Sequence, residues 1–369
     1  MTNGLCKFFV LDLTVGRSGA VCSEYLALAG MDVVRVERPC EPDRGERAEH
    51  IAFNLNKKCI TLDENTPEGA NILRRLAAKA DVIVENRRGA LKELALDYES
   101  VKKTNPGVVY ISIPPYASDS PWADYPADRS VISAMSGATY LCGNTGCDPL
   151  EPGGDLPDVA SSLYAATATA SALWKREESG EGAFIEVNQM DSVISLGRAT
   201  YEQYYMTKSN IRCGNQLLGR SPTDLFETSD GYVAIMCVGE RHFPPLCEAI
   251  GQPELANDPR FRTQADRVAH RAEINAIISE WTRKRTKFEV MKILLLQYRA
   301  ICCAVYTLED IINAEDLRDM KFIQRVYDEV LGEMWLPVFP GVCEAFNPVA
   351  EAPKSVSLSE LGKEERYGL

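Results

Sequence analysis

Strands and helices alternate through the first 113 residues, and this alternation constrains the fold more than any other feature of the sequence. Apolar runs of strand length are separated by segments with helical periodicity. Because parallel strands need crossover connections, this order predicts an α/β fold, with a Rossmann-like parallel sheet covered by helices on both faces. The predicted strands are 8–13, 32–36, 81–85 and 107–113, and the predicted helices between them include 18–30 and 67–80.

A long helix and a further strand complete this first domain. Residues 116–157 are rich in Gly, Pro, Ser and Asp, and irregular segments of this length inside a compact domain usually carry function. Residues 158–176 then read as a helix with many small side chains, which allow close packing against a neighbour. The strand 183–187 follows. We therefore assign residues 1–200 to a large Rossmann-like domain.

The second half of the chain has a different pattern. A Ser-Asp-Gly turn at 229–231 precedes the strand 232–237, which is typical of a hairpin. Helical segments follow, so that residues 221–318 are predicted to form a smaller α+β domain. Residues 201–220 are expected to be a linker, and 319–369 a second linker with a C-terminal segment that returns to the large domain.

The charge balance argues against nucleic acid as a partner. The chain has 40 Lys and Arg against 53 Asp and Glu, a net charge of −13, whereas a nucleic-acid surface needs clustered basic residues. No stretch approaches the roughly 18 consecutive apolar residues of a membrane helix, and the first residues do not resemble a secretion signal. We expect a cytoplasmic protein with neither a membrane nor a nucleic-acid partner, in which any anionic ligand meets a local basic cluster.

Cysteine and histidine positions offer little for metal chemistry. The twelve cysteines are spread along a long chain, which favours reduced, buried thiols. No C-x-x-C occurs, and no cysteine pair has a neighbouring histidine, so we predict no metal site. His50, His242 and His270 are the only histidines, and none lies in an H-x-x-x-H or G-x-S-x-G motif.

Basic residues gather where the predicted strands end. The carboxyl ends of parallel strands meet at one edge of the sheet and collect ligands there. In an acidic protein such a cluster indicates a polyanionic ligand, although scattered surface charges are the alternative. The glycines after the first strand do not form the G-x-G-x-x-G of dinucleotide-binding proteins, so NAD is weakly supported. The residues at this edge are Arg17, Arg38, Asn86, Arg87 and Arg88, joined by Lys57 and Lys58 if their loop lies over the same edge.

Asp158 stands at the start of the helix with small side chains, just after Gly153, Gly154 and Pro157. A carboxylate in the first turn of a helix is favoured by the helix dipole whatever its function. The pattern alone therefore does not distinguish a catalytic aspartate from a structural one.

Seven short segments match, in order, the motifs of one known family. They are 11–14 (LDLT), 32–39 (DVVRVERP), 55–58 (LNKK), 60–63 (ITLD), 66–69 (TPEG), 80–86 (ADVIVEN) and 158–166 (DVASSLYAA). Together they resemble the class III CoA-transferase family (CaiB/BaiF), which includes formyl-CoA and carnitine CoA-transferases and shares its fold with α-methylacyl-CoA racemases. The resemblance is strong over residues 5–200 and looser to about 320.

The resemblance implies covalent catalysis on Asp158. In the family, the matching aspartate attacks an acyl-CoA thioester and forms an aspartyl mixed anhydride and free CoA thiolate. The thiolate then forms an aspartyl-CoA thioester and releases the first acid, and an acceptor carboxylate repeats these steps in reverse. A carboxylate stores the acyl group at comparable energy, so no metal or histidine base is required. The implied partners are coenzyme A as acyl-CoA and a carboxylic acid.

The resemblance also implies which residues hold CoA and how the chains assemble. The positions that match those around the adenine and phosphates are Arg17, Arg38, Asn56, Lys57, Asn86 and Arg87. The family usually has an aromatic residue where this chain has Arg87. Family members form interlocked homodimers, each subunit threaded through a hole in the other, and the same assembly is implied here.

Two other functions stay open. A racemase would exchange the α-proton of an acyl-CoA between an aspartate and a histidine on opposite sides of the substrate. Asp158 would again be the aspartate, but this chain reads PADR at 126–129, where the racemases carry their histidine. A non-catalytic acyl-CoA-binding relative is the third possibility, and the retention of Asp158 speaks against it.

Overall fold

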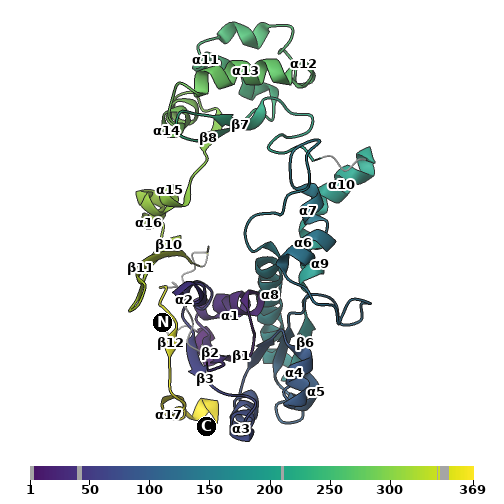
Figure 1. Ribbon diagram of the computed structural model, residues 1–369, viewed down its shortest axis with the longest axis vertical. Helices are drawn as coiled ribbons and strands as arrows, with labels where there is room; N and C mark the ends of the chain where they lie inside the picture. The colour runs from purple at the N-terminus through teal and green to yellow at the C-terminus, as the bar shows by residue number, and fades with distance from the viewer. Residues whose placement is uncertain (1–3, 40–43, 209–211, 339, 341–348) are drawn as a thin grey trace. The chain divides into compact units, whose positions relative to one another are not determined.

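The computed structural model describes residues 4–39, 44–208, 212–338, 340 and 349–369. The chain divides into two compact units, and each is described by itself. The first unit takes residues from 1–139, 151–208 and 314–369, and the second from 140–150 and 209–313. Figure 1 labels the elements of both units.

The first unit is built on a seven-stranded sheet in the order β12-β3-β2-β1-β4-β5-β6, in which every neighbouring pair is parallel. This confirms the predicted parallel sheet. The order of the strands reverses between β1 and β4, and open α/β sheets bind ligands at such a switch point. The strands are β1 (Phe9–Asp12), β2 (Asp32–Glu37), β3 (Lys58–Thr61), β4 (Val82–Glu85), β5 (Val109–Ser112), β6 (Ala183–Glu186) and β12 (Lys354–Ser355).

Alternate residues of β1 pack into separate cores on the two faces of the sheet. Leu11 belongs to one buried cluster with Leu73 of α3, and Val10 belongs to another with Leu26 of α1 and Ala165 of α8. Strands covered on both faces carry continuous apolar runs, which is why they are visible in the sequence. The helices are α1 (Arg17–Leu28), α3 (Pro67–Ala77) and α8 (Leu156–Ser179).

The helix with small side chains is α8, which begins two residues before the predicted start. It packs along α1, and Figure 1 shows the two helices side by side. Ala160, Ser161 and Ser162 are buried, and the Ser162 hydroxyl donates a hydrogen bond to the carbonyl of Ser18 on α1. This close packing fixes the start of α8, and with it Asp158. No helix in the described ranges combines the length and the apolar character required to span a bilayer.

Three elements around the sheet carry no clear signal in the sequence. Helix α2 (Arg44–Ala52) is mostly polar, and β12 has only two residues. The hairpin of β10 (Ile323–Asp328) and β11 (Gly332–Pro337) packs on α2 through a cluster that contains Val326 and Ile51. These contacts join residues almost 300 positions apart, so local periodicity cannot predict them.

The C-terminal tail docks on the same sheet. The ring of Tyr367 is fully buried and meets Phe9 edge to face, with 5.0 Å between ring centroids. Its phenol donates a hydrogen bond to Asp32, which also pairs with Arg366 and Lys58. The charged tail is therefore part of the first unit.

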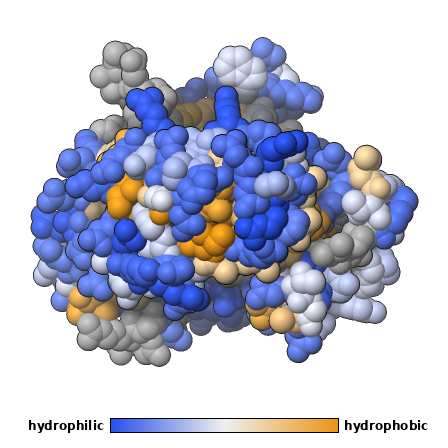
Figure 2. All heavy atoms as spheres, turned by 90° about the horizontal axis from the view of Figure 1, so that it is seen from above, coloured by the Kyte–Doolittle hydropathy of each residue, from blue (hydrophilic) through white to orange (hydrophobic). Residues whose placement is uncertain are grey.

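The second unit contains a three-stranded antiparallel sheet, β7-β8-β9, and the predicted hairpin is confirmed. Its core includes Phe226, Val233 and Ile274. Residues 140–150, which the sequence analysis places within 1–200, group with this unit. The end that carries α11 to α13 is mostly hydrophilic, with small apolar patches (Figure 2). The main elements are β7 (Thr223–Glu227), β8 (Tyr232–Met236), β9 (Ile301–Ala304), α11 (Phe243–Ala249), α12 (Gln264–Ala269), α13 (Arg271–Thr282) and α14 (Lys287–Met291).

Candidate functional site

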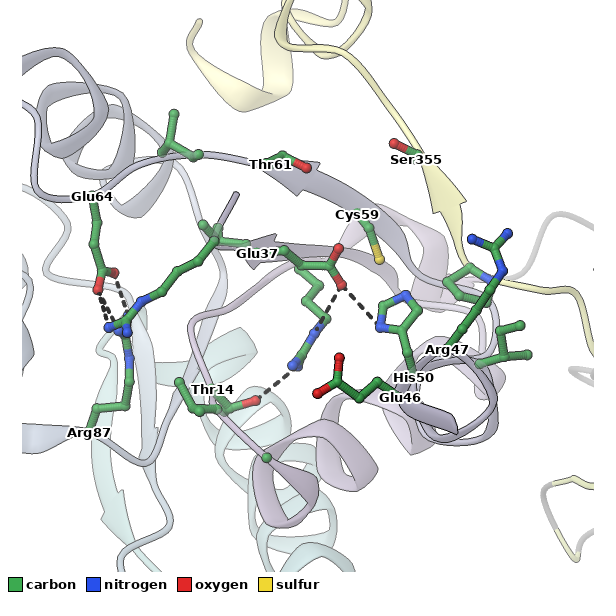
Figure 3. A pocket seen from close by; sticks show the side chains of 18 of the residues that line it. Thr14, Glu37, Glu46, Arg47, His50, Cys59, Thr61, Glu64, Arg87 and Ser355 are labelled. Carbon is green, nitrogen blue, oxygen red and sulfur yellow. Dashed lines mark hydrogen bonds and ion pairs between the residues drawn. The ribbon is translucent and has the colours of Figure 1, made fainter. Parts of the chain in front are cut away.

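A pocket of about 590 Å³ opens at the carboxyl edge of the parallel sheet (Figure 3). The segments that follow four adjacent strands line it: Gly16 after β1, Arg38 after β2, Glu64 after β3 and Arg87 after β4. Helix α2 and β12 supply further walls. The pocket lies where the topology places ligand sites, and two of the predicted basic residues line it.

Glu64 joins Arg38 and Arg87, two of the arginines that line the pocket. Arg87 makes a bidentate pair with it, with Nη1 and Nη2 at 2.7 and 2.8 Å from the two carboxylate oxygens. Arg38 Nη2 donates to the same carboxylate at 2.7 Å. These guanidinium groups, Arg87 foremost, lower the pKa of Glu64 to about 2. The carboxylate offsets one of two positive charges, so the group keeps one net positive charge toward the pocket.

Asn86 ties two loops together at the switch point. Its side-chain oxygen accepts from the backbone N–H of Val15 at 2.9 Å, and its side-chain nitrogen donates to the carbonyl of Val15 at 2.6 Å. The loops after β1 and β4 are thereby held in register. Val15 lines the pocket, so Asn86 shapes the wall of the site through this loop.

Arg17 follows the pocket residue Gly16 in the chain and reaches toward α8. Its Nε and Nη2 bind the carboxylate of Glu49 on α2 at 2.8 and 2.9 Å, and its Nη1 pairs with Asp155. The side chain of Arg129 also donates to Asp155, at 2.8 Å. Arg17 thus links the pocket wall to the residues that precede Asp158.

Asp158 lies in the first turn of α8 and is only 8% exposed. Among the described residues, its carboxylate has one side-chain hydrogen-bond partner, Gln189, whose Nε2 donates to Oδ1 at 2.7 Å. Burial, reinforced by the charge of Asp155, raises the pKa of Asp158, while Arg17 and Arg129 oppose the rise. This aspartate is poorly solvated yet has few donors, which is the environment of a reactive carboxylate.

The comparisons with known proteins agree with one another. A model of the family described as CoA-transferase family III matches residues 5–354. The chain belongs to this family. The protein is therefore a CoA-transferase, and its family acts on CoA thioesters.

Individual relatives of this CoA-transferase cover most of its length. It is 30% identical over 338 residues to succinyl-CoA–D-citramalate CoA-transferase of Chloroflexus aurantiacus, covering 88% of this chain and 84% of the relative. It is 32% identical over 301 residues to succinate–glutarate CoA-transferase of Agrobacterium fabrum, covering 76% and 75%. A crystal structure of a CAIB/BAIF family protein from Brucella suis superposes with a TM-score of 0.87, 28% identity and coverage of 96% and 97%.

Lys57 of this CoA-transferase requires a correction. The resemblance implies a contact with CoA, but the structure places Lys57 in the core, only 1% exposed. Its ammonium donates to the carbonyl of Ala20 and to Asn54 Oδ1, each at 2.7 Å, and lies 3.2 Å from Asp12 Oδ2. The ammonium is therefore bonded to protein groups rather than turned toward the pocket.

The other residues of the 55–58 segment also bind protein groups. Asn56, at φ +63°, holds the C-terminal segment by donating to the carbonyl of Val349 at 2.9 Å and accepting from the backbone N–H of Glu351 at 2.8 Å. Lys58 pairs with Asp32 at 3.0 Å. These contacts position β12, which borders the pocket. The side chain of Arg88 lies outside the described residues.

Glu37, His50 and Cys59 are the residues within the described ranges that could hold a metal ion, with ligand atoms within 4.8 Å of one another. Figure 3 shows them on one wall of the pocket. Burial lowers the pKa of His50 and raises that of the Cys59 thiol. The guanidinium of Arg35 lies 3.5 Å from Glu37 and opposes a cation there. The absence of a metal site stays a prediction.

Two contacts of the site were not predicted from the sequence. Glu64 and Gln189 are common residue types in ordinary positions, and neither belongs to a motif that the sequence analysis used. Their partners, Arg87 and Asp158, are 23 and 31 positions away. An acidic residue within a predicted basic cluster is the one signal that could have pointed to Glu64.

Proposed function

We propose that this enzyme moves CoA from an acyl-CoA to a carboxylic acid through covalent intermediates on Asp158. The observation that carries the proposal is the state of this carboxylate, which is buried at the start of α8 and, among the residues that the structure describes, is bonded by a side chain through one oxygen. The family and the named relatives support the overall reaction. Of the three histidines, His50 belongs to the first unit, and its ring faces Glu37.

The proposed steps exchange acyl groups without net proton transfer. Oδ2 of Asp158 attacks the acyl carbonyl, the C–S bond breaks, and CoA leaves as a thiolate. The thiolate then attacks Cγ of Asp158, and the bond from Cγ to the bridging oxygen breaks, which releases the donor acid. The acceptor carboxylate attacks the aspartyl thioester and the sequence runs in reverse. An aspartate that is ionised and poorly solvated suits the first step.

CoA is proposed to bind in the pocket at the sheet edge. Arg38 is the most accessible of its cations, with a side chain 62% exposed, and it is placed to meet phosphate. Arg87 is less exposed and presents its guanidinium beside it. Arg17 spans the distance between this pocket and Asp155, so the pantetheine arm would pass it on the way to Asp158.

The proposed acids are short dicarboxylic acids. The two relatives are named for succinyl-CoA, D-citramalate, succinate and glutarate, and each of these acids carries two carboxyl groups. A second carboxylate needs a cation near the reacting aspartate. Arg129 meets this need, because its charge acts on Asp158 while its side chain is 47% exposed.

We also propose the interlocked homodimer. Large apolar side chains stand exposed on elements of the first unit, and surfaces of this kind usually mark an interface. Helix α10 (Arg198–Thr207) has no buried residue at all. The exposed side chains on α8 and α10 are Leu163, Tyr164, Trp174, Tyr201, Tyr204, Tyr205 and Met206. A second copy of the chain would cover them.

Trapping of the intermediates tests the mechanism. The enzyme is incubated with succinyl-CoA, then treated with hydroxylamine or borohydride and digested. Asp158 is expected to carry the modification, and fragmentation of the peptide distinguishes it from Asp155, three positions earlier. Unmodified Asp158 in a sample that transfers CoA would overturn the mechanism. Solvent deuterium at the α-carbon of a 2-methylacyl-CoA, without any acceptor acid, would instead indicate a racemase.

A further inference from the structure

Gln189 makes the one side-chain hydrogen bond that the described residues offer to Asp158. It is the first residue of α9 (Gln189–Leu196), and the preceding Asn188 caps that helix by accepting from the backbone N–H of Asp191 at 2.8 Å. Gln189 itself is 7% exposed. Its Nε2 lies 2.7 Å from Oδ1 of Asp158. A carboxylate can only accept, so the amide nitrogen is the donor.

The position of this donor matters for a reaction on the aspartate itself. When a nucleophile attacks Cγ of an acylated aspartate, negative charge develops on the oxygen that remains a carbonyl. A donor already placed on that oxygen stabilises the tetrahedral state without reorganisation. Gln189 contacts Oδ1, which leaves Oδ2 as the oxygen that carries the acyl group.

We propose that Gln189 is a catalytic residue that stabilises the oxyanion on Oδ1 of Asp158 each time its acyl carbon is attacked. The inference rests on the proposed covalent mechanism. In the forward direction the CoA thiolate uses its electron pair to form a bond to Cγ of the anhydride, and the π electron pair of the Cγ=Oδ1 carbonyl moves onto Oδ1. The oxyanion then collapses, the bond from Cγ to Oδ2 breaks, and the donor acid leaves as a carboxylate. No proton is gained or lost.

Among the described groups around Asp158, the neutral amide of Gln189 is the one placed to stabilise the oxyanion. Asp155, which also acts on Asp158, is negative and forms ion pairs with both Arg17 and Arg129. The two arginines act on Asp158 through space, whereas Gln189 touches Oδ1, the oxygen on which the negative charge develops. An amide stabilises the oxyanion without holding the resting carboxylate as tightly as a cation would, so Asp158 stays nucleophilic.

The test is Gln189→Met, which keeps length and burial and removes the donor. We expect kcat to fall by about 100-fold, the effect of losing one oxyanion donor, with KM for succinyl-CoA within twofold. With succinyl-CoA alone, a transient of free CoA thiol is expected in the variant, because the anhydride forms but its thiolysis is slow. A thiol reagent in a stopped-flow experiment measures this transient.

Gln216→Met is the matched control. It breaks another Gln–Asp hydrogen bond, that of Gln216 to Asp224 at 3.0 Å in the second unit, and should leave kcat unchanged. If Gln189→Met does not fold, Gln189→Leu provides the same measurement. A kcat within threefold of wild type in a folded variant, or a loss confined to KM, would overturn the inference. Failure of Asp158 labelling in the wild-type enzyme would instead overturn the mechanism, so the two failures are distinguishable.

Discussion

Two buried aspartates of the first unit, Asp12 and Asp158, differ in how fully their carboxylates are hydrogen-bonded, and only the second is proposed to react. Asp12, at the end of β1, is fully buried and accepts from Thr14, Ser23, Arg35 and Lys57. These partners hold its pKa well below the usual range, although burial alone would raise it. Burial with a complete set of donors makes a carboxylate inert.

Asp158 is almost as buried but far less satisfied. The described part of the chain gives it one side-chain donor, the amide of Gln189, and its pKa is raised because burial outweighs the attraction of the nearby arginines. Keeping such a buried carboxylate ionised costs free energy. In the proposed mechanism this cost is removed when Asp158 forms its covalent bond and loses its charge. The number of hydrogen-bond donors, rather than the degree of burial, therefore distinguishes the Asp158 carboxylate from that of Asp12.

The sharpest way to break this comparison is to remove each carboxylate in turn. Asp158→Asn should abolish CoA transfer, with a loss of about 10⁴-fold or more, because the nucleophile is gone. The temperature of its thermal unfolding should stay close to that of wild type, because the new side-chain amide oxygen can still accept the hydrogen bond from Gln189. Activity is measured with succinyl-CoA and glutarate, and folding by circular dichroism. Substantial residual transfer in this variant would place the nucleophile elsewhere.

Asp12→Asn should have the opposite profile. Lys57 and Arg35 would keep their buried charges without the compensating carboxylate, and we expect the free energy of unfolding to fall by about 3–5 kcal/mol. The measurement is urea unfolding. A matched control is Asp63→Asn, at an exposed carboxylate that bonds only within its own turn.

The pH dependence of Asp12 has a definite sign. Its pKa in the folded state lies below the unfolded value, so its contribution to stability is full above pH 4 and is lost as the pH falls toward the folded pKa. Asp12→Asn should therefore be destabilised most near neutral pH, with a smaller difference from wild type in strong acid. Equal destabilisation at pH 7 and pH 3 would contradict this account.

The strands of the sheet and the side-chain contacts of the site differ in how well the sequence predicts them. The strands β1, β2, β4 and β5 are visible because strands covered on both faces are continuously apolar. The same pattern shows which basic residues follow strand ends. Neither this pattern nor the resemblance shows which way a side chain points, and the prediction that Lys57 contacts CoA therefore misses that it faces Asp12.

The contacts around Asp158 and beside the pocket join residues far apart in the sequence, so local sequence patterns do not predict them. Gln189 reaches Asp158 only because α8 and α9 pack together. Asn56 bonds to Glu351 only because the chain returns there 295 residues later. Propensity and periodicity describe neighbours in sequence, whereas these partners are set by tertiary packing. The resemblance singles out Asp158, and the structure adds that its carboxylate is buried and bonded by Gln189.

A substitution of Arg129 tests how much the nearby positive charge influences Asp158. Arg129→Leu removes a charge that lowers the pKa of this aspartate, so the acid limb of kcat/KM should move to higher pH. Activity requires the ionised carboxylate and is lost as the pH falls through its pKa. The variant should also lose about tenfold in kcat/KM for succinyl-CoA relative to butyryl-CoA, which lacks the second carboxylate. Arg129→Lys, which keeps the charge, should retain most of both properties, and an unchanged preference in Arg129→Leu would exclude the proposed contact.

The smallest expected effect concerns Glu64, which lines the pocket. Glu64 is a carboxylate with several strong donors, like Asp12, but it lines an open pocket and its donors are the arginines proposed for CoA. Glu64→Gln leaves both guanidinium groups uncompensated, so CoA should bind a few-fold more tightly at low salt, with a steeper loss of affinity as salt rises. Calorimetry at two ionic strengths measures both changes. If Glu64 instead serves chiefly to hold Arg87 in place, affinity falls in the variant. Glu64 would then belong with Asp12 among the structural carboxylates, and donor number alone would describe all three acids.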